Sequence, residues 1–423
     1  MPKSINKVLI IGAGPAGVSA ALHLRQSNNI SPVLYEIRPE PTTLGGAIGI
    51  PSNGSRLLGR LGLYEELLTR ASSGSDLVIH SVKGHVLGKM DQTGWSKEKT
   101  GFGYLRIKRA DLLDVLLKAA QNAGIPIHYG KRLVGINETD EGVTATFSDG
   151  TSDTANLLLG CDGIHSAVRK TYVDPEITPE YSGISNVFSI VPTFQLPPAA
   201  MSLDGLNATL VTDGLFAITP CTRSGDSIYW FFSREVTMPG SGYTRDGWEE
   251  HGKKEVDEFK ATMDGFLKDL KGEWGDLLRR VVYQTQVVKF YPIFRLPLGG
   301  RWSRGRCLLI GDAAHAMQPH ASQGVSMALE DIFLLSRLLQ KPDYSLDDVF
   351  SVYDQRRRPR VNEMHKTAER NGTVRRSTSG WRLAVNEIVA SGALWIYEAC
   401  NLDKLGLGQK GLAYDVAEEN LDL

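Results

Sequence analysis

Residues 7–17 read Lys-Val-Leu-Ile-Ile-Gly-Ala-Gly-Pro-Ala-Gly, and this stretch decides the fold that we expect. Four of the first five residues, Val8 to Ile11, are branched and apolar, as in a parallel strand that is buried on both faces. The glycines follow a G-x-G-x-x-G pattern, and residues 15–26 continue with the apolar spacing of a helix. Gly12 permits a tight turn, Gly14 lets the backbone approach a pyrophosphate, and Gly17 lets the helix pack closely on the strand. The stretch therefore predicts a dinucleotide-binding unit with phosphates at the helix N-terminus.

An acidic residue follows where such a unit requires one. A second strand is predicted at residues 32–35, and it ends at Glu36. An acid about 20 residues beyond the glycine turn accepts hydrogen bonds from the adenosine ribose. Because a carboxylate repels a 2′-phosphate, we do not expect the tightly held dinucleotide to be NADP. The alternative interpretation is a glycine-rich turn that binds no ligand.

The composition narrows the class of protein. The chain has 423 residues, of which 42% are hydrophobic and 22% are charged, as in a globular protein of two or three domains. A net charge of −1 argues against a nucleic-acid partner, and no apolar run is long enough to predict a membrane-spanning helix. No signal peptide is recognisable, so we expect a cytoplasmic protein with reduced thiols. The cysteines have neither metal-ligand nor redox spacing and are Cys161, Cys221, Cys307 and Cys400.

A second strand-to-helix turn is predicted at residues 156–169. An apolar strand ends at Asp162-Gly163, and a helix opens near Ser166, which is a suitable N-cap. Arg169 follows three residues into this helix. Spacing alone leaves two interpretations open: a ligand-binding motif, or a capped turn in which Asp162 is structural.

A third turn is predicted within residues 306–331, which contain a strand that ends at Gly311-Asp312. The carboxylate of Asp312 can accept a hydrogen bond from a sugar or ribityl hydroxyl. A loop at residues 319–324 leads into an amphipathic helix at about 324–340. The N-terminus of this helix would stabilise negative charge on a group bound in the loop.

The three turns, taken in this order, resemble the motifs of the group A FAD-dependent monooxygenases, the para-hydroxybenzoate hydroxylase-like family. The segments GPAG, DGIHSAVR and GDAAHAMQPHASQG carry the resemblance, which covers about residues 5–360. The chain looks most similar to salicylate-hydroxylase-like and fungal secondary-metabolite members. The resemblance implies tightly bound FAD, with NADPH or NADH as a transient co-substrate, because no second nucleotide fingerprint is present. Residues 406–411, Gly-Leu-Gly-Gln-Lys-Gly, have glycines but no preceding strand, and we interpret them as a loop.

The resemblance also assigns residues to the cofactor. Residues 45–50 would lie along the flavin, and Arg109 would reach the FAD phosphate region, with Arg106 as a second candidate. Many family members have Gly where this chain has Ser322, and Ser adopts a positive φ less readily. Ser326 stands where Asn is frequent in the family. The cofactor-binding residues that the resemblance implies are Gly12, Gly14, Ala16, Gly17, Glu36, Gly49, Arg109, Asp162, Asp312, Gly324 and Val325.

The reaction implied by the resemblance is the insertion of one atom of O2 into an aromatic or polycyclic small molecule, by hydroxylation or epoxidation through a flavin hydroperoxide. Secondary metabolism is one setting for it. No motif identifies a catalytic base, and His315 and His320 are interpreted as loop residues rather than metal ligands. The alternatives are a tetracycline-inactivating type of monooxygenase, a flavin halogenase, and a relative that keeps the fold without enzymatic activity.

The domain organisation that we expect is α/β: a Rossmann-like FAD-binding domain of the GR2 type, an inserted antiparallel-sheet substrate domain, and C-terminal helices. The FAD-binding domain would comprise residues 1–75, 100–178 and 285–345, and the substrate domain residues 76–99 and 179–284. The pocket between them is expected to be lined by Phe216, Tyr229, Phe231 and Phe294. Arg223, Arg234 and Arg295 are, with Tyr229, candidates to polarise the substrate.

Residues 346–423 are expected to form the C-terminal helical region. A helix pair bent at Pro359 is predicted, with a solvated basic run at 356–358. A helix at 381–399 is interrupted by charges, so we expect it to pack across the domains or in a dimer rather than insert stably into a membrane. The protein would be a monomer or a homodimer.

Overall fold

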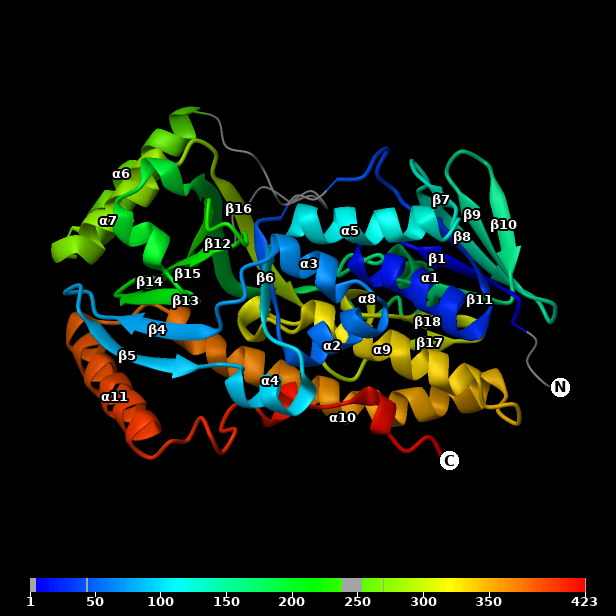
Figure 1. The fold of residues 1–423 in the computed structure, drawn as a ribbon. Coiled ribbons are helices and arrows are strands. Elements are labelled where there is room, and N and C mark those ends of the chain that lie inside the picture. The colour runs from blue at the N-terminus through cyan, green and yellow to red at the C-terminus, as the bar shows by residue number, and fades with distance from the viewer. Residues whose placement is uncertain (1–4, 43–44, 238–252, 269, 423) are drawn as a thin grey trace.

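The computed structural model describes residues 5–42, 45–237, 253–268 and 270–422 (Figure 1). Its helices are α1 (Pro15–Asn28), α2 (Ser52–Arg60), α3 (Tyr64–Arg70), α4 (Gly94–Thr100), α5 (Arg109–Asn122), α6 (Lys253–Leu267), α7 (Gly272–Gln284), α8 (Asp312–His315), α9 (Gly324–Leu339), α10 (Leu346–Gly372) and α11 (Gly380–Ala399). Its strands are β1 (Lys7–Ile11), β2 (Ser31–Tyr35), β3 (Ala47–Ile50), β4 (Asp76–His80), β5 (Val86–Asp91), β6 (Leu105–Lys108), β7 (Ile127–His128), β8 (Leu133–Glu138), β9 (Val143–Phe147), β10 (Ser152–Ala155), β11 (Leu157–Gly160), β12 (Glu180–Pro192), β13 (Leu206–Val211), β14 (Gly214–Pro220), β15 (Ser227–Glu235), β16 (Lys289–Arg295), β17 (Ser303–Arg304) and β18 (Cys307–Leu309).

The first sheet has the strand order β17-β18-β11-β1-β2-β7, and its pairs are parallel except for β17 with β18. The predicted elements at residues 7–11, 15–26 and 32–35 are confirmed as β1, α1 and β2. Because parallel strands end at the same edge, the loops after β1, β11 and β18 lie together, although they are far apart in the sequence. The three turns that the motifs predict therefore meet at one edge of the sheet.

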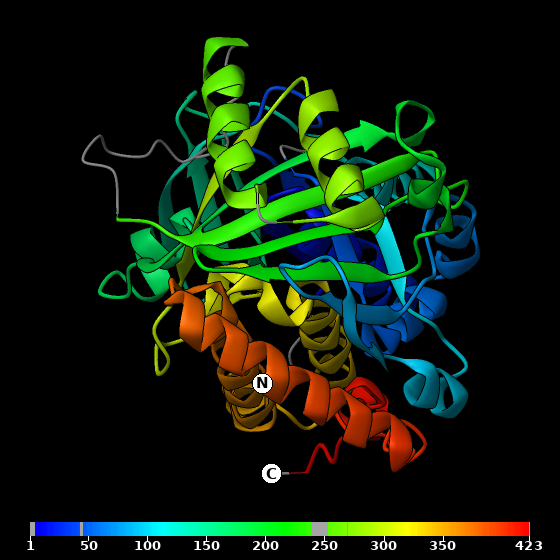
Figure 2. The same ribbon diagram turned by 90° about the vertical axis from the view of Figure 1, so that its left-hand side faces the viewer.

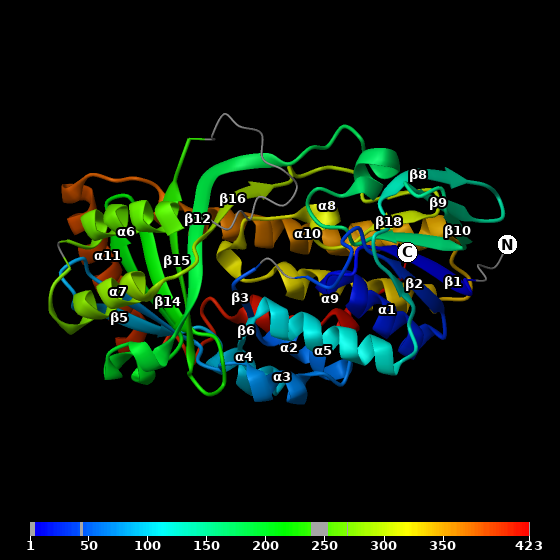
Figure 3. The same cartoon turned by 90° about the horizontal axis from the view of Figure 1, so that it is seen from above.

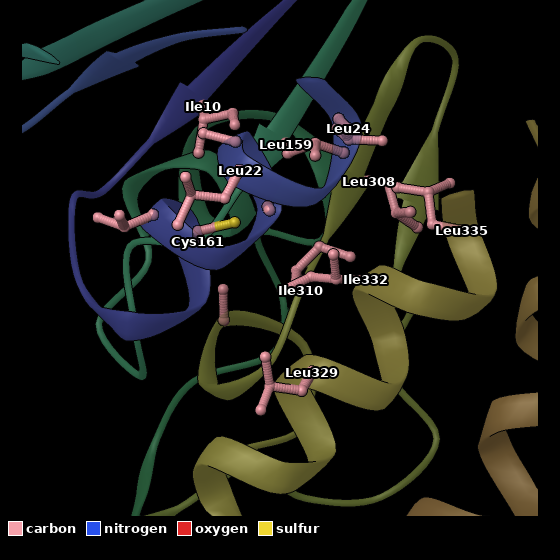
Figure 4. Packing of buried hydrophobic residues seen from close by; sticks show 14 of the residues in the cluster. Ile10, Leu22, Leu24, Leu159, Cys161, Leu308, Ile310, Leu329, Ile332 and Leu335 are labelled. Carbon is pink, nitrogen blue, oxygen red and sulfur yellow. The ribbon is translucent and has the colours of Figure 1, made fainter. Parts of the chain in front are cut away.

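The core of this half lies between the parallel sheet and the helices α1 and α9 (Figure 4). Ile10 from β1, Leu159 from β11 and Leu308 from β18 are completely buried there. Branched apolar side chains fill both faces of such a strand, which explains the continuous apolar runs in the sequence. The predicted helix at 324–340 is confirmed as α9, with Leu329 and Leu335 in this core.

The second sheet has the order β16-β12-β15-β14-β13-β4-β5 and is antiparallel except for the β13–β4 pair. The predicted antiparallel strands are thus confirmed. Helices α6 and α7 cover one face (Figure 2), where Phe216, Trp230 and Phe232 are buried. The predicted helix at 249–271 is observed as α6, and the residues 249–252 and 269 of that prediction lie outside the described chain.

A two-stranded ribbon, β3 paired with β6, lies between the two sheets (Figure 3). Its side chains alternate between two faces. Ile50, Leu105 and Ile107 are completely buried in the core of the parallel sheet. Arg106 and Lys108 therefore point in the opposite direction, toward the second sheet.

The C-terminal region corrects two predictions. The helix pair bent at Pro359 is wrong, because α10 runs as one helix from Leu346 to Gly372 with Pro359 inside it. The solvated basic run is also wrong at its centre, since Arg357 has no exposed surface. Consecutive residues of a helix point in different directions, so one residue of a charged run can face the core while its neighbours face the solvent. A run of like charges in the sequence does not show which residue that is. Residues 406–409 lie in turns, in line with the predicted loop, and residues 410–411 begin the short 3-10 helix Lys410–Leu412.

Helix α11 confirms the predicted helix at 381–399 and packs against β5. The carboxylate of Glu387 accepts a hydrogen bond from the amide of Val82 at 2.8 Å. Large apolar side chains remain exposed on the helix, and they include Trp381, Ile388 and Trp395. In the ranges given above, no helix is both long enough and apolar enough to cross a membrane.

Candidate active site between the two sheets

The glycine turn after β1 has the geometry that each of its glycines requires. Gly12 has φ +104°, and a Cβ there would lie 2.5 Å from the carbonyl oxygen of Cys161. A Cβ on Gly17 would lie 1.9 Å from the carbonyl oxygen of Gly12, so helix and strand touch at this point. A Cβ on Gly14 would meet no atom within 4 Å. The turn is thus packed from inside the protein at Gly12 and Gly17, and it is open at Gly14, where α1 begins.

Glu36 braces the same turn. One carboxylate oxygen accepts a hydrogen bond from the amide of Ala13 at 2.8 Å, and the other accepts one from the amide of Arg38 at 3.0 Å. The residue lies at the wall of a cavity of about 210 Å³. That cavity is lined by Ala13, Gly14, Pro15, Glu36, Arg38, Glu40, Pro41, Thr42, Arg109, Leu113, Leu117 and Tyr129. Its apolar and polar walls suit a flat base and a sugar.

Arg109 begins α5 and reaches the segment that precedes β3. Its amide donates to the carbonyl oxygen of Gly46 at 2.9 Å. A Cβ on Gly45 would lie 2.0 Å from Cδ of Arg109, so the arginine stem runs along this glycine. The alternative of a fully solvated charge at a helix start is not observed, because Arg109 is partly buried and lines the cavity.

Asp162 forms the capped turn that the sequence left open as one interpretation. Its carboxylate accepts hydrogen bonds from the Ser166 hydroxyl at 2.5 Å and from the amide of Ala167 at 2.6 Å. Ser166 is the N-cap as predicted, since its hydroxyl accepts from the amide of Arg169 at 2.9 Å. Burial raises the pKa of Asp162 even though these bonds oppose the shift. The carboxylate therefore holds the backbone of the turn.

Arg169 joins the second turn to the third. Its Nη1 donates to the carbonyl oxygen of Ala313 in α8 at 2.8 Å, and its Nε donates to the carbonyl oxygen of Ile177 at 3.3 Å. The side chain is 3% exposed. Arg169 thus acts on the site through the position of the α8 backbone.

Asp312 stands at the start of α8, directly after Gly311, which has φ +61°. The side chain of Asp312 is accessible to solvent, but many protein atoms lie around it. This surrounding protein disfavours the charged form and raises the pKa of its carboxyl group. The charges of Arg109 and His315 oppose that shift. A Cβ on Gly324 would lie 3.9 Å from one Asp312 oxygen, so this carboxylate lies beside the first turn of α9.

The loop before α9 keeps a left-handed residue at Ser322, which has φ +53° and ψ +32°. Serine is therefore held in the conformation that glycine adopts most readily. Val325 follows Gly324 in the first turn of α9, so their amides belong to the unpaired N-terminal group of that helix. These amides carry the positive end of the helix dipole.

A buried ionic network supports the loop before α9. Asp331 accepts hydrogen bonds from the amide of Gly311 at 2.9 Å, from Nε2 of His315 at 2.7 Å and from Nε of Arg357 at 2.8 Å. Burial alone would raise the pKa of Asp331, but the charges of His315 and Arg357 lower it overall. The carboxylate therefore stays ionised and fixes the turn in front of it.

Glu330 extends the network toward α2. It accepts from Nη1 of Arg357 at 2.7 Å, from Nη2 of Arg360 at 3.2 Å and from Nδ2 of Asn53 at 2.8 Å. Asn53 also donates to the side-chain oxygen of Gln323 at 2.9 Å. The loop before α9 is thus connected to α2 and α10 through side chains with almost no exposed surface.

The chain fits an extended dinucleotide. The space at Gly14 and the cavity beside Glu36 would take the phosphate and adenosine parts. Near the loop, the buried Nε2 of Gln323 and the Oγ of Ser326 have no hydrogen-bond partner among the residues that the structure describes. Such buried donors are rare unless a ligand or water completes them. Asn is frequent at position 326 in the family, and the Ser326 hydroxyl of this chain makes no hydrogen bond with the rest of the described chain.

The second sheet presents Tyr229 to this site. A Cβ on Gly46 would lie 2.2 Å from the Tyr229 ring, so the tyrosine lies against the segment before β3. Phe231 is on the same face, and its ring centroid is 5.7 Å from that of Tyr229. Burial raises the pKa of Tyr229, and the charges of Arg109 and Arg106 oppose the shift. Its hydroxyl therefore stays protonated at neutral pH.

One of the predicted pocket residues lies elsewhere. Phe216 is on the opposite face of the sheet, in the core with α6 and α7. Strand alternation puts neighbours on opposite faces, and both faces of β14 are apolar. Phe294 contacts the rings of His165 and Tyr181.

The three candidate arginines do not meet the site either. Arg223 is exposed and donates to the carbonyl oxygen of Leu68. Arg234 lies over the Phe266 ring, and Arg295 is paired with Glu369. Sequence reasoning missed Tyr104, because the pairing of its hydroxyl with Arg106 leaves no recognisable motif. It also gave no sign that Asn53 bonds to Gln323 and Glu330, which are distant in the chain.

Comparison with known proteins agrees with this geometry. The family described as "FAD binding domain" matches residues 6–264 and 298–368. The chain belongs to this family of FAD-dependent monooxygenases. It is 30% identical over 364 residues to the FAD-dependent urate hydroxylase of Mycolicibacterium vanbaalenii, covering 85% of this chain and 86% of that protein. It is 27% identical over 374 residues to the 6-hydroxynicotinate 3-monooxygenase of Pseudomonas fluorescens, covering 87% and 92%.

Solved structures share the fold of this monooxygenase. HpxO of Klebsiella pneumoniae, in complex with FAD and uric acid, has a TM-score of 0.77 at 23% identity and covers 95% of this chain and 96% of its own. A salicylate hydroxylase substrate complex has a TM-score of 0.75 at 24% identity, covering 98% and 97%. The protein is thus an enzyme that uses FAD and NAD(P)H, and neither a halogenase nor a non-enzymatic relative is favoured.

Proposed function

We propose that this monooxygenase holds FAD across the edge of its parallel sheet. The adenosine would lie in the cavity beside Glu36, and the pyrophosphate at the open Gly14 and the α1 N-terminus. The flavin would lie between β3 and the first turn of α9. The residues proposed to contact FAD are Gly12, Gly14, Ala16, Gly17, Glu36, Gly49, Arg109, Asp312, Gly324 and Val325, with Asp162 acting through the turn that it holds.

FAD, when bound, supplies the activation of O2 and the transfer of one oxygen atom. The chain's own groups bind and orient. The amides of Gly324 and Val325 would stabilise negative charge on the ring beside them. The network of Asp331, Glu330 and Arg357 would keep these amides in place. Tyr229 and Phe231 would exclude water from the sheet side of the ring.

We infer that the substrate is an aromatic small molecule that enters between Tyr229 and the β3–β6 ribbon. The relatives support this class, because their names include hydroxylases of urate and of 6-hydroxynicotinate. We propose that residues 1–75, 100–178 and 285–345 bind FAD and that residues 76–99 and 179–284 bind the substrate. Strand β16, at 289–295, is the exception to a division by sheets, because it pairs in the second sheet. Free thiols suit a reducing compartment, so we propose that the enzyme is a cytoplasmic monomer or homodimer.

One observation carries the proposal: the glycine turn, Asp312 and the α9 N-terminus meet at one edge of the sheet, opposite Tyr229. The experiment is to purify the protein, record its visible spectrum and follow NADH and NADPH oxidation with a panel of phenols, hydroxypyridines and purines. We expect a yellow protein whose oxidation rate rises with one compound class and whose product is heavier by one oxygen atom. A protein that stays colourless after incubation with FAD would refute the proposal.

A further inference from the structure

Arg106 lies where the two halves of the molecule meet. Its strand neighbours Leu105 and Ile107 are completely buried in the core of the parallel sheet, so the side chain of Arg106 points away from that core. Lys108, on the same face of β6, donates to the hydroxyl of Ser227 in β15 at 3.0 Å. Arg106 therefore faces the second sheet, on the side where the substrate is proposed to enter.

The guanidinium of Arg106 is only partly satisfied by the protein. The residue is 7% exposed, its Nη2 donates to the Tyr104 hydroxyl at 2.8 Å, and its Nε has no hydrogen-bond partner in the described part of the chain. Throughout the described ranges, Arg106 forms no ion pair with a carboxylate. A buried charge without a counter-charge is strongly unfavourable. Departures of this kind are expected at functional sites, where a ligand can complete the group.

The position of Tyr104 ties Arg106 to the flavin side of the site. A Cβ on Gly49 would lie 1.8 Å from the Tyr104 hydroxyl and 3.2 Å from Oγ of Ser322. Gly49 is also the residue directly opposite Arg106 in the β3–β6 pair. The arginine, its tyrosine partner and the loop before α9 are thus close neighbours.

The phosphates of FAD are not the natural partner of Arg106. Arg109 lines the cavity beside Gly14 and Glu36, whereas Arg106 is not among the residues that line it. Arg106 lies near Tyr229 and Cys221 on the side of the second sheet: burial raises the pKa of both groups, and the charge of Arg106 opposes the rise together with Arg109 at Tyr229 and Lys108 at Cys221. Its missing partner belongs to the substrate side.

A second arginine on that side has the same character. Arg375 lies in the turn Thr373–Arg375, which packs against β14 and β15. Its Nη1 donates to the carbonyl oxygen of Asn371, and its Nε has no hydrogen-bond partner within the ranges that the structure covers. Burial lowers the pKa of Arg375 to about 10, with no carboxylate opposing the shift. The substrate side thus carries positive charge that the described residues leave unbalanced.

We propose that Arg106 binds the carboxylate of an aromatic acid, so that this enzyme selects aromatic carboxylates over uncharged rings of the same shape. This inference rests on the monooxygenase function proposed above and names its substrate class. A guanidinium offers parallel N–H donors in a planar fork that matches the two oxygens of a carboxylate. The Tyr104 bond holds that fork in one orientation.

The test is isothermal titration calorimetry of the FAD-loaded protein at about pH 7 with matched pairs of ligands: salicylate against salicylamide, and 6-hydroxynicotinate against 6-hydroxynicotinamide. We expect at least one acid to bind about tenfold or more tightly than its amide. In Arg106→Met, the affinity for that acid falls about 10-fold to 100-fold, as for a lost hydrogen bond to a charged group, and the amide stays within about twofold. Arg106→Lys keeps part of the preference, and the surface variant Arg223→Met keeps all of it.

Equal affinity for acid and amide in the natural protein would overturn the inference. So would an Arg106→Met variant that weakens both ligands equally, or one that weakens FAD and leaves the preference intact. If an uncharged phenol is oxygenated and no acid binds, the proposed function stands and the Arg106 assignment is wrong. If FAD does not bind, the proposed function fails, and the same titrations without FAD still decide the assignment.

Discussion

Two buried arginines of this protein have opposite surroundings. Arg357, under the loop before α9, donates to Asp331 at 2.8 Å and to Glu330 at 2.7 Å. Arg106, under the second sheet, has the Tyr104 hydroxyl and no carboxylate among the residues that the structure describes. The two arginines are 0% and 7% exposed. The difference separates a charge that the chain neutralises itself, and that holds the fold, from a charge that we propose a ligand neutralises.

The largest effect is expected where the chain supplies both charges. Arg357→Met removes the cation that two buried carboxylates share and leaves Glu330 with Arg360 and Asp331 with His315, so we expect the free energy of unfolding to fall by roughly 3–5 kcal/mol. Urea unfolding followed by circular dichroism measures this. The matched control is Arg356→Met, because Arg356 is partly exposed and donates only to the carbonyl oxygen of Asp422 among the described partners. A loss below about 1 kcal/mol is expected there. Equal losses of unfolding free energy in the two variants would contradict this expectation.

Two glycines of the turn after β1 offer the same contrast without charges, between a residue that holds the fold and a residue that we propose binds a ligand. Gly17→Ala puts a Cβ against the carbonyl oxygen of Gly12, so we expect a loss of roughly 1–3 kcal/mol in unfolding free energy without FAD. Gly14→Ala meets no atom within 4 Å and should leave that stability within about 0.5 kcal/mol. It should nevertheless weaken FAD about tenfold or more, because the proposed pyrophosphate site is narrowed. Flavin fluorescence titration measures the affinity, and unchanged FAD binding in Gly14→Ala would count against this placement.

The ion network predicts a pH dependence. The pKa values of Glu330 and Asp331 are lowered in the folded protein, since the nearby cations outweigh burial. Their stabilising contribution is therefore complete above the unfolded pKa values, near 4, and is lost as the pH falls through the lower folded values. We expect the difference in Tm between the natural protein and Arg357→Met to shrink between about pH 5 and pH 3. A difference that stays constant over this range would show that the variant acts through packing alone.

The smallest effect is expected at Ser322. Glycine adopts the left-handed conformation of residue 322 without strain, but it loses more conformational entropy on folding than serine does. Ser322→Gly should therefore raise the free energy of unfolding by less than about 1 kcal/mol. Ala321→Gly is the control, because Ala321 has no positive φ and gains nothing from glycine. Scanning calorimetry of the two variants gives the comparison, and a lower Tm for Ser322→Gly than for Ala321→Gly would contradict it.

The cofactor half could be predicted from the sequence because its recognition is local. Gly12, Gly14 and Gly17 stand within six residues and act through backbone geometry, which leaves a fixed pattern in the chain. The Ser166 cap is local in the same sense. These features depend on neighbours only a turn away.

The substrate half could not be predicted in this way. Phe216 and Phe231 look alike in the sequence, and only the pairing of β14 with β15 decides which face each one takes. The run of basic residues predicts a solvated face for Arg357, because its partners Glu330 and Asp331 lie on another helix and leave no signal beside it in the sequence. Arg106 differs from Arg357 only through what the folded chain brings beside it. Contacts between side chains that are far apart in the sequence leave no local pattern in it.

The dependence of the α9 loop on α10 has a consequence for synthesis. The glycine turn leaves the ribosome early, whereas Asp312, the α9 N-terminus and Arg357 belong to the last third of the chain. At about 5–20 residues per second, the supporting arginines follow the first turn by tens of seconds. A nascent chain that ends before Arg357 would therefore have an adenosine-binding half without a firm flavin-binding loop. Loading of the cofactor becomes the final step of maturation, and ribosome-bound chains should acquire their yellow colour only after α10 has been made.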